Sequence, residues 1–541
     1  GEIGMNLNLY GHAGKWLMID LGVTFGEENL PGIEVVMPDP SFIVERKEDL
    51  VGLVLTHAHE DHLGAVPYLW DKLRCPIYAT PFTAALLRRK LADDGIQEEV
   101  PITVVEMSGS FTLGPFEIEL VTLTHSIPEP NALIIRTPCG TVLHTGDWKL
   151  DDDPLVGETY DEARLRRLAD EGVLAMVCDS TNAVVPGLSG SELDVREGLQ
   201  KVLPRFKNRV AVACFASNVA RLETVIRVAE ACGRRVSLVG RSMHRIHAAA
   251  RESGYLQDLP PLVDVREVEY LPKEEILLLC TGSQGERRAA LWRIAHDAHP
   301  EVVLEAGDAV IFSSRVIPGN EKDIAALYNS LAKLEIEVVT DETVRGEGHS
   351  IHVSGHPARD ELAQMYQWVR PQIAIPVHGE ARHLEAHAKL ALECQVPMTV
   401  VPENGSLIRL APGKPQIVDH VPHGRLAVDG NRLLPIDSPI LRARRKQILA
   451  GSAVISLVVD AAGELLADAK LSAVDLLDLQ ADRNIVDELL DDIEAAHERL
   501  RPKARRDDEA VAEAVRIATR RGFNRLIGKK PIVEVQVIRV D

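Results

Sequence analysis

The sequence has few aromatic residues, no framework of paired cysteines, no long apolar run and no excess of basic charge. Phe, Trp and Tyr make up 4% of its 541 residues, so extensive stacking of bases on aromatic side chains is not indicated. No run approaches the roughly 18 apolar residues of a membrane span, and we expect no membrane segment. Hydrophobic residues still make up 45% of the chain, which is enough for packed cores and argues against global disorder.

The seven cysteines are scattered along the chain and form no C-x-x-C pair. An odd count without framework spacing argues against a disulfide scaffold and favours a reducing compartment, so we expect a cytoplasmic protein. No signal peptide is recognisable. Because the sequence begins at Gly1 without a Met, we also expect further native residues before it.

The charge is acidic overall but unevenly distributed. The net charge of −21, from 60 basic and 81 acidic side chains, argues by itself against a nucleic-acid partner. However, residues 196–345 hold 21 basic and 21 acidic side chains, and residues 441–541 hold 18 of each. The excess acid therefore lies in 1–195 and 346–440. This predicts one acidic body made from two pieces of chain, with a neutral insert and a neutral tail.

Short apolar runs predict a mixed α/β architecture. In residues 1–180, several runs end in a His or an Asp, and such strand ends are where α/β enzymes place their sites. Residues 196–345 alternate strands with helices, which predicts a largely parallel sheet. The tail predicts three strands, 453–460, 464–474 and 531–540, and two helices, 484–500 and 507–521. The predicted domains are 1–195 with 346–420, an insert 196–345, a linker 421–446 and a tail domain 447–541.

The strongest local signal is the heptapeptide Thr56–His62, which directly follows an apolar strand. Three His and one Asp within six residues cannot all face one core. Imidazole and carboxylate together suit zinc, and neutral His is its commonest nitrogen ligand. Four ligands on one tight loop cannot comfortably surround a single ion, but they can serve two neighbouring ions.

The pattern H-x-H-x-D-H resembles the metallo-β-lactamase superfamily, in which the remaining ligands follow in order along the chain. Matching residues are found here at the ends of predicted strands, and Asp20 matches the acidic residue that orients the ligand loop. The resemblance implies two zinc ions, with Mn²⁺ or Mg²⁺ as alternatives. The implied ligands are His57, His59 and His125 for one ion, Asp61, His62 and His378 for the other, and Asp147 as the bridge between them.

His378 lies 231 residues after Asp147, and the neutral insert falls inside this interval, an arrangement similar to that of the β-CASP nucleases. Asp179 in CDST and the element His352–His356 (H-V-S-G-H) match two further motifs of those enzymes. Along residues 1–440 the chain resembles the ribonuclease J family, on the stretches GEIGMN, FASN, GRSM, TGSQGE and PVHGE. The implied fold is a metallo-β-lactamase αββα sandwich with an inserted β-CASP βαβ domain and a small α+β C-terminal domain.

By the same resemblance, the chain hydrolyses RNA to leave a 5′-phosphate and a 3′-hydroxyl, as a 5′→3′ exonuclease and as an endonuclease, in RNA decay and maturation. The expected catalytic residues are Asp61, Asp179 and His356. The expected substrate-binding residues are His352, Val353, Ser354, Gly355 and His356 at the scissile phosphate, and Ser217 and Asn218 in a pocket for the 5′-monophosphate. Ser283 and Gln284 are weaker candidates for that pocket, and helix capping is the plain alternative for both pairs.

Other assignments stay open at this point. The cluster Arg234, Arg235, Arg241 and Arg245 predicts a solvated face, with phosphate tracking as the alternative. The stretch 501–506 (RPKARR) predicts a charged loop between helices rather than an RNA-binding patch. We expect single-stranded RNA as partner, a homodimer or homotetramer to which the tail contributes, and membership of an RNA-degradation complex. The alternative functions are a β-CASP DNA nuclease, a small-molecule hydrolase, and a non-catalytic RNA-binding subunit.

Overall fold

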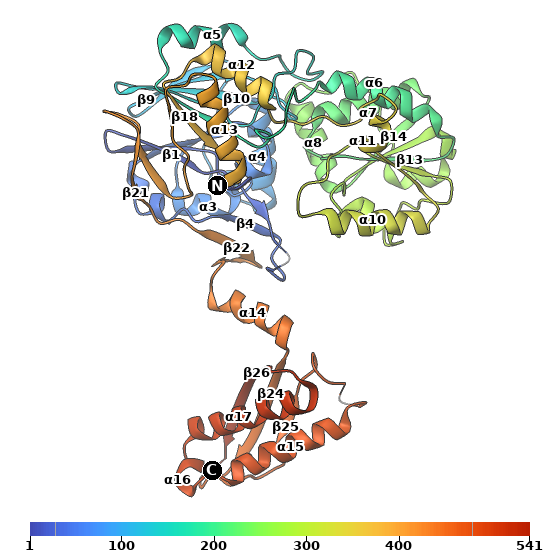
Figure 1. Cartoon of the computed structure of the whole chain (residues 1–541). Coiled ribbons are helices and arrows are strands. Elements are labelled where there is room, and N and C mark those ends of the chain that lie inside the picture. Colours follow the sequence, from blue (N-terminus) through green and yellow to red (C-terminus); the bar gives the residue numbers. More distant parts are fainter. Residues whose placement is uncertain (28, 479, 541) are drawn as a thin grey trace. The chain divides into compact units, whose positions relative to one another are not determined.

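The computed structural model describes residues 1–27, 29–478 and 480–540. The chain divides into two compact units. The first unit comprises Gly1–Thr24 and Met37–Arg425, and the second comprises Phe25–Val36 and Leu426–Asp541 (Figure 1).

The first unit contains two sheets packed face to face. The five-stranded sheet has the order β1 (Asn8–His12), β2 (Lys15–Ile19), β5 (Leu50–Val54), β6 (Ile77–Ala79), β7 (Ile102–Val104). The seven-stranded sheet has the order β19 (Met398–Thr399), β18 (Ile373–Val377), β12 (Ala175–Asp179), β11 (Gly140–His144), β10 (Asn131–Thr137), β9 (Phe116–Thr122), β8 (Ser110–Leu113).

Side chains from both sheets form one core between them, including Leu17 and Val54 from the first sheet and Ile118, Leu133 and Ile375 from the second. On its other face, the seven-stranded sheet packs against α5 (Glu162–Glu171), α12 (Arg359–Val369) and α13 (Ala381–Glu393). In chain order, α2 (Glu60–Leu63), α3 (Val66–Leu73) and α4 (Pro81–Asp93) connect the parallel strands β5, β6 and β7. The predicted sandwich of sheets and helices is confirmed.

The insert forms a separate five-stranded sheet in which every neighbouring pair is parallel. Its order is β14 (Arg235–Val239), β15 (Ile276–Cys280), β13 (Val210–Ala213), β16 (Ala309–Phe312), β17 (Glu337–Thr340). The three central strands are buried throughout, as their continuous apolar sequence requires in a sheet covered on both faces. The helices are α6 (Glu192–Val202), α7 (Val219–Ala231), α8 (Arg241–Glu252), α9 (Ala290–Ala295), α10 (Glu321–Lys333) and α11 (Asp341–Arg345).

The second unit contains a three-stranded sheet against two long helices. The sheet order is β25 (Lys470–Ser472), β24 (Ser452–Val459), β26 (Ile532–Arg539), and α15 (Arg483–Glu498) and α17 (Asp508–Ile527) share its core. Along β24, buried and half-buried residues alternate, because the helices cover one face of the sheet. The basic stretch expected as a loop contains a short helix, α16 (Pro502–Arg505).

The structure differs from the expected tail in two places. The stretch 421–446, predicted as a linker, contains β22 (Arg425–Asp429), β23 (Arg432–Pro435) and most of α14 (Pro439–Ala450). The hairpin closes on two residues, Gly430 and Asn431, and Ser438 caps the helix ahead of a proline at its first position. These local signals outweigh the absence of a long apolar period. Of the strand predicted at 464–474, only β25 forms.

The remaining elements are short. They are β3 (Thr24–Phe25), β4 (Val35–Pro38), α1 (Ser41–Val44), β20 (Ser406–Arg409), β21 (Gln416–His420) and the 3₁₀ turns at 47–49, 203–205, 265–270 and 273–275. Among the described residues, no helix combines the length and the apolarity needed to cross a bilayer. All seven cysteines carry free thiols.

Candidate metal centre

The sandwich places ionisable side chains at neighbouring strand ends. Because consecutive parallel strands end at the same edge of a sheet, residues far apart in sequence meet there. These residues are Asp20 after β2, His57 and His59 after β5, His125 after β9, Asp147 after β11, Asp179 at the end of β12 and His378 after β18.

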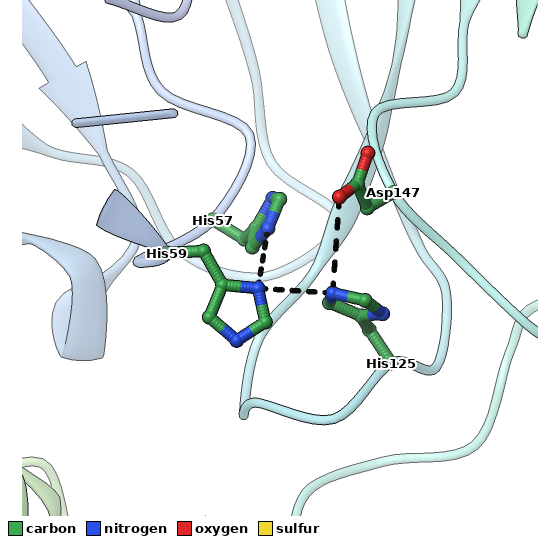
Figure 2. Close-up of side chains that lie close together, drawn as sticks. All are labelled: His57, His59, His125 and Asp147. Atoms are coloured by element: carbon green, nitrogen blue, oxygen red, sulfur yellow. Dashed lines mark hydrogen bonds and ion pairs between the residues drawn. The ribbon is translucent and has the colours of Figure 1, made fainter. Parts of the chain in front are cut away.

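Three histidines and one aspartate form the first ligand group (Figure 2). His59 Nδ1 lies 3.1 Å from His57 Nε2 and 3.0 Å from His125 Nε2. Asp147 Oδ2 lies 4.0 Å from His125 Nε2. Imidazole nitrogens this close together need a shared proton or a shared cation.

The outer nitrogens of this group are held by neighbours that set which nitrogen faces inward. His125 Nδ1–H donates to the carbonyl of Gly355, and His57 Nδ1 lies 3.0 Å from the hydroxyl of Thr56. Each contact occupies Nδ1 and leaves Nε2 of that ring facing the group, whereas His59 faces it through Nδ1. Gly355 is needed at this point, because a Cβ there would lie 2.7 Å from the His125 ring.

The imidazoles of the first group are held in their neutral form. Burial, reinforced by the neighbouring histidines, lowers the pKa of His57 and of His125 well below its usual value. Burial also lowers the pKa of His59 to about 4, although Asp61 and Asp147 oppose it. Neutral imidazole is the form that binds a metal ion, so the protein is preorganised for a cation here.

The second ligand group is richer in carboxylates and comprises Asp61, His62, Asp147 and His378. His62 Nε2 lies 3.2 Å from Asp147 Oδ2, and His378 Nε2 lies 3.1 Å from Asp61 Oδ2. Burial acts to lower the pKa of both histidines, but the carboxylates, Asp147 first, outweigh it and raise each pKa well above the usual value. Asp147 belongs to both groups, and the nearby imidazoles outweigh its burial and lower its pKa to about 2.

Asp20 supports the ligand loop from behind. Its carboxylate accepts hydrogen bonds from the backbone N–H and the hydroxyl of Thr56, both at 2.8 Å, and from His62 Nδ1 at 2.7 Å. Asp20 has a left-handed backbone, φ +62°. Two residues later, Gly22 leaves room for the loop, since a Cβ there would lie 1.7 Å from the carbonyl oxygen of Asp61. Asp20 thus contacts the first and the last residue of the loop Thr56–His62.

Asp179 and His356 form a pair beside the two groups. His356 Nδ1–H donates to Asp179 Oδ2 at 2.8 Å, and the same Nδ1 lies 3.7 Å from Asp147 Oδ2. Burial acts to lower the pKa of His356, but Asp179 and Asp147 outweigh it and raise the pKa. The raised pKa favours the protonated form of the His356 ring, close to the ligand groups.

The rest of the element 352–356 divides into half-buried and buried residues. His352 and Ser354 are half-buried, whereas Val353 is buried, and a Cβ on Gly190 would collide with its side chain. The Val353 side chain is therefore not available to a substrate. Burial, with Arg221 as the next cause, lowers the pKa of His352 to about 3.

Of the residues expected to bind the 5′ end of the RNA, most are buried. Ser217 is half-buried two positions before the start of α7, and both ends of the Asn218 side-chain amide form hydrogen bonds. Its Oδ1 caps the helix by accepting from Arg221 N, and its Nδ2 donates to Glu192. Ser283 and Gln284 are both buried, and the Gln284 amide holds the loop 315–320.

The basic cluster of the insert is not one solvated face. Arg234 is buried and donates hydrogen bonds to the backbone carbonyls of Asn208, Phe206 and Ile276. These bonds connect the segment 206–208 to the start of β15. Arg245 pairs with Asp93, while Arg235 and Arg241 are exposed. The expectation of a solvated face is therefore wrong for Arg234.

Three residues of the site were missed by sequence reasoning. Thr56 contacts both Asp20 and His57, Thr181 Oγ1 donates to Asp179 at 2.7 Å and lies 2.9 Å from His378 Nδ1, and Asn182 Nδ2 donates to Ser354 Oγ at 2.8 Å. Thr56 directly precedes His57 in sequence, and Thr181 and Asn182 follow Asp179 by two and three positions. Polar residues flanking a ligand could therefore have indicated the outer contacts that orient it.

The donor set fits divalent cations. Within each group the ligand atoms, imidazole nitrogens and carboxylate oxygens, all lie within 4.8 Å of one another. Such mixed nitrogen and oxygen ligands suit divalent first-row metals. The centre therefore supports a divalent metal cofactor.

Four family models match the chain in the order that the fold suggests. They are the metallo-beta-lactamase superfamily over residues 6–171, the ribonuclease J beta-CASP domain over 207–331, the Zn-dependent metallo-hydrolase RNA specificity domain over 341–399 and the ribonuclease J C-terminal domain over 439–540. The last match includes the tail.

Several curated relatives are similar over most of the chain. Ribonuclease J of Sinorhizobium meliloti is 44% identical over 100% of this chain and 96% of its own length. Ribonuclease J of Mycolicibacterium smegmatis is 43% identical over 79% and 76%, and that of Helicobacter pylori strain 26695 is 34% identical over 90% and 71%.

A solved structure shares the fold. The crystal structure of a protein of unknown function from Enterococcus faecalis V583 matches with a TM-score of 0.51 and 17% identity, over 74% of this chain and 96% of that one. At this identity the likeness concerns the fold alone. The sequence identity over the whole chain and the four matched domains show that the chain belongs to the ribonuclease J family of metal-dependent ribonucleases.

Proposed function

We propose that this protein is a two-zinc ribonuclease that degrades RNA from 5′-monophosphate ends in the 5′→3′ direction and also cuts internally. One observation carries the proposal: two ligand groups share Asp147, and the Asp179–His356 pair lies directly beside them. A scissile phosphate between these parts would meet both charge neutralisation and a proton donor.

Zinc is the proposed metal because imidazole dominates the ligand set, with carboxylates completing it. His57, His59 and His125 would hold one ion, and Asp61, His62 and His378 would hold the other. Asp147 would serve both. Mn²⁺ and Mg²⁺ are the alternatives, and metal analysis of the purified protein distinguishes them.

The chain's own residues account for orientation and proton transfer. The bound ions would supply activation of water and neutralisation of the phosphate charge. His356, whose pKa is raised by its carboxylate neighbours once they outweigh its burial, would give its Nε2 proton to the leaving 3′ oxygen. Asp179 holds Nδ1 of that ring and so sets which nitrogen faces the substrate. His352, Ser354 and the backbone of Val353 and Gly355 would contact the phosphate oxygens.

The 5′ end would be recognised in the insert. Ser217 precedes α7, and its hydroxyl and the first amides of the helix can receive a phosphate. The Asn218 side chain would act indirectly, because its amide is bonded to Glu192 and to the helix. A terminal monophosphate bound here would favour exonucleolytic action.

The wider setting follows the same proposal. The domains would be 1–195 with 346–420, 196–345 and 447–541, and single-stranded RNA would be the substrate in RNA decay and maturation. The protein would act in the cytoplasm, as a homodimer or homotetramer to which the C-terminal domain contributes, and within an RNA-degradation complex.

The test is to incubate zinc-loaded protein with one RNA sequence carrying a 5′-monophosphate, a 5′-triphosphate or a 5′-hydroxyl. We expect mononucleotides to form fastest from the monophosphate, and internal fragments to form at similar rates from all three. Equal release of mononucleotides from all three RNAs would contradict the proposed pocket for the 5′-monophosphate. Equal or faster turnover of the matching single-stranded DNA would instead favour a DNA nuclease.

A further inference from the structure

A buried ion pair outside the metal centre joins two helices of the insert. Glu192 begins α6 and Arg221 lies in α7, and their side chains are each 1% exposed. The guanidinium donates through Nε and Nη2 to the Glu192 carboxylate at 3.2 Å. Burying two charges costs desolvation that their attraction often only offsets, so stability alone is a weak reason for such a pair.

The other side of the guanidinium holds the backbone that leads into the element 352–356. Arg221 Nη1 donates to the carbonyl and the hydroxyl oxygen of Ser313, at 2.7 and 2.6 Å, and to the carbonyl of Ile351 at 3.3 Å. The Ser313 hydroxyl donates to the same Ile351 carbonyl at 2.6 Å. Two donors thus fix the peptide group directly before His352.

The opposite edge of this backbone is held as firmly. Asp341 Oδ1 accepts from the backbone N–H of Ile351 at 2.8 Å and of His352 at 3.0 Å. Helix α6 packs against the same segment, since a Cβ on Gly198 would lie 1.9 Å from the carbonyl oxygen of Ser350. Residues 350–352 are therefore clamped from the N–H side, the C=O side and the helix.

Glu192 connects this clamp to the metal centre and to the 5′ region. Its backbone N–H donates to Asp151 Oδ2 at 3.0 Å, and Asp151 forms a buried ion pair with Lys149, two residues beyond Asp147. Its side chain accepts from the Asn218 amide at 3.1 Å. One chain of buried polar contacts therefore runs from the Asp147 strand end to residue 351.

We propose that Arg221, acting with Glu192 and Ser313, is a positioning residue that sets the element 352–356 against Asp179 and the ligand groups. This inference rests on the proposed function, in which that element contacts the phosphate and carries His356. Misplacing a reacting group by about 1 Å can cost on the order of 100-fold in rate. Positioning of this element would explain why the chain buries the charges of Arg221 and Glu192, which packing alone does not explain.

Two variants loosen the clamp, and a third is a matched control. Arg221→Lys keeps the charge but loses the planar fork that reaches Glu192, Ser313 and Ile351 together. Ser313→Ala removes one of the two donors to the Ile351 carbonyl with little change in volume. Arg234→Lys alters another buried arginine of the insert, which grips backbone carbonyls away from the element.

The experiment uses the full-length zinc-loaded protein and two readouts. Hydrogen exchange of the amides of 350–356 reports the placement of the element, and kcat and KM on 5′-monophosphate RNA report its consequence. For Arg221→Lys we expect exchange about tenfold faster and kcat lower by about 10- to 100-fold, with KM within about twofold. Ser313→Ala should show smaller changes in the same direction, and Arg234→Lys should show neither.

Unchanged exchange at 350–356 in both clamp variants would overturn the proposal, and so would faster exchange with unchanged kcat. Equal losses in Arg234→Lys would reduce Arg221 to a general structural role. Failure of the wild-type protein to cleave RNA would overturn the proposed function instead. The exchange comparison would then still decide whether Arg221 holds the element.

Discussion

The two compact units differ in how they bury charged side chains. The first unit has exposed ion pairs, such as Lys15 with Asp49, but also fully buried ones, such as Lys149 with Asp151, whose side chains are at most 1% exposed. Among the described residues of the second unit, the buried polar side chains are only Ser438, His497 and Thr519. Its ion pairs are half-buried or exposed; for example, Arg525, with a side chain 52% exposed, pairs with Glu488 and Asp492 on the neighbouring helix.

Burying a charge removes it from water, and the loss of hydration is tolerated only when partners satisfy the charge. In the first unit such partners surround both the ligand groups and the buried pairs Lys149–Asp151 and Arg221–Glu192. Exposed pairs contribute little, so the second unit depends on its apolar core between β24, α15 and α17. Substitutions should therefore affect chemistry in the first unit and stability alone in the second.

The largest effect should come from removing a ligand. His57→Ala and Asp61→Ala each break one ligand group, so we expect cleavage to fall by at least about 1,000-fold, or about 4 kcal/mol in activation free energy. Each variant should also bind fewer metal ions per chain while keeping its circular dichroism spectrum. RNA cleavage and elemental analysis measure both, with His420→Ala, an exposed histidine of β21, as the control. Full activity in either variant would defeat the ligand assignment.

In the second unit, the largest effect should come from its core. Phe523 is fully buried against the helices and the sheet, so Phe523→Ala should destabilise this unit by about 3–5 kcal/mol. Hydrogen exchange of α17 and β24 in the full-length protein measures this loss. Val474→Ala, at a side chain 83% exposed, is the control and should change stability by less than about 0.5 kcal/mol. Similar losses in both variants would contradict the apolar-core account.

A buried histidine of the first unit should make stability depend on pH. Burial lowers the pKa of His387 to about 4, although Asp179 opposes it, and the ring lies 2.8 Å from both the Ser180 and the Tyr366 hydroxyl oxygen. The folded protein keeps this ring neutral, whereas the unfolded chain protonates it near pH 6.5. Its contribution is therefore complete above about pH 6.5 and is lost as the pH falls towards 4, up to about 3 kcal/mol.

Denaturant unfolding between pH 7.5 and 4.5 tests this dependence. His387→Gln should flatten the acid side of the profile relative to the wild-type protein. The exposed control His423→Gln should leave the profile unchanged. A wild-type slope retained in His387→Gln would assign the acid sensitivity to other groups.

The smallest effect should come from the exposed pairs of the second unit. Arg525→Ala removes contacts to Glu488 and Asp492, both at 2.9 Å, yet should change stability by no more than about 0.5 kcal/mol. Thermal unfolding at low and high salt measures it. A loss above about 2 kcal/mol would mean that this unit also relies on charge.

Much of the fold and the location of the centre could be predicted from the sequence. Continuous apolar runs in the insert predicted a parallel sheet, because strands covered on both faces have no polar side. The heptapeptide Thr56–His62 marked the ligand loop, because a strand end rich in His and Asp has no packing explanation. The hairpin at Gly430 and Asn431 was missed although its turn residues were present, because no long apolar period accompanied it.

The candidate ligands, their order along the chain and the family to which the chain belongs could be recognised in the sequence alone, because they depend on short spacings and strand ends. The surroundings of each charge could be seen only in the folded chain. Asn218 is bonded to Glu192, Arg234 is buried, and Arg221 grips the backbone at Ile351 from 130 residues away in sequence. The physical reason is that burial and hydrogen-bond partners are supplied by distant segments, which leave no mark in local spacing.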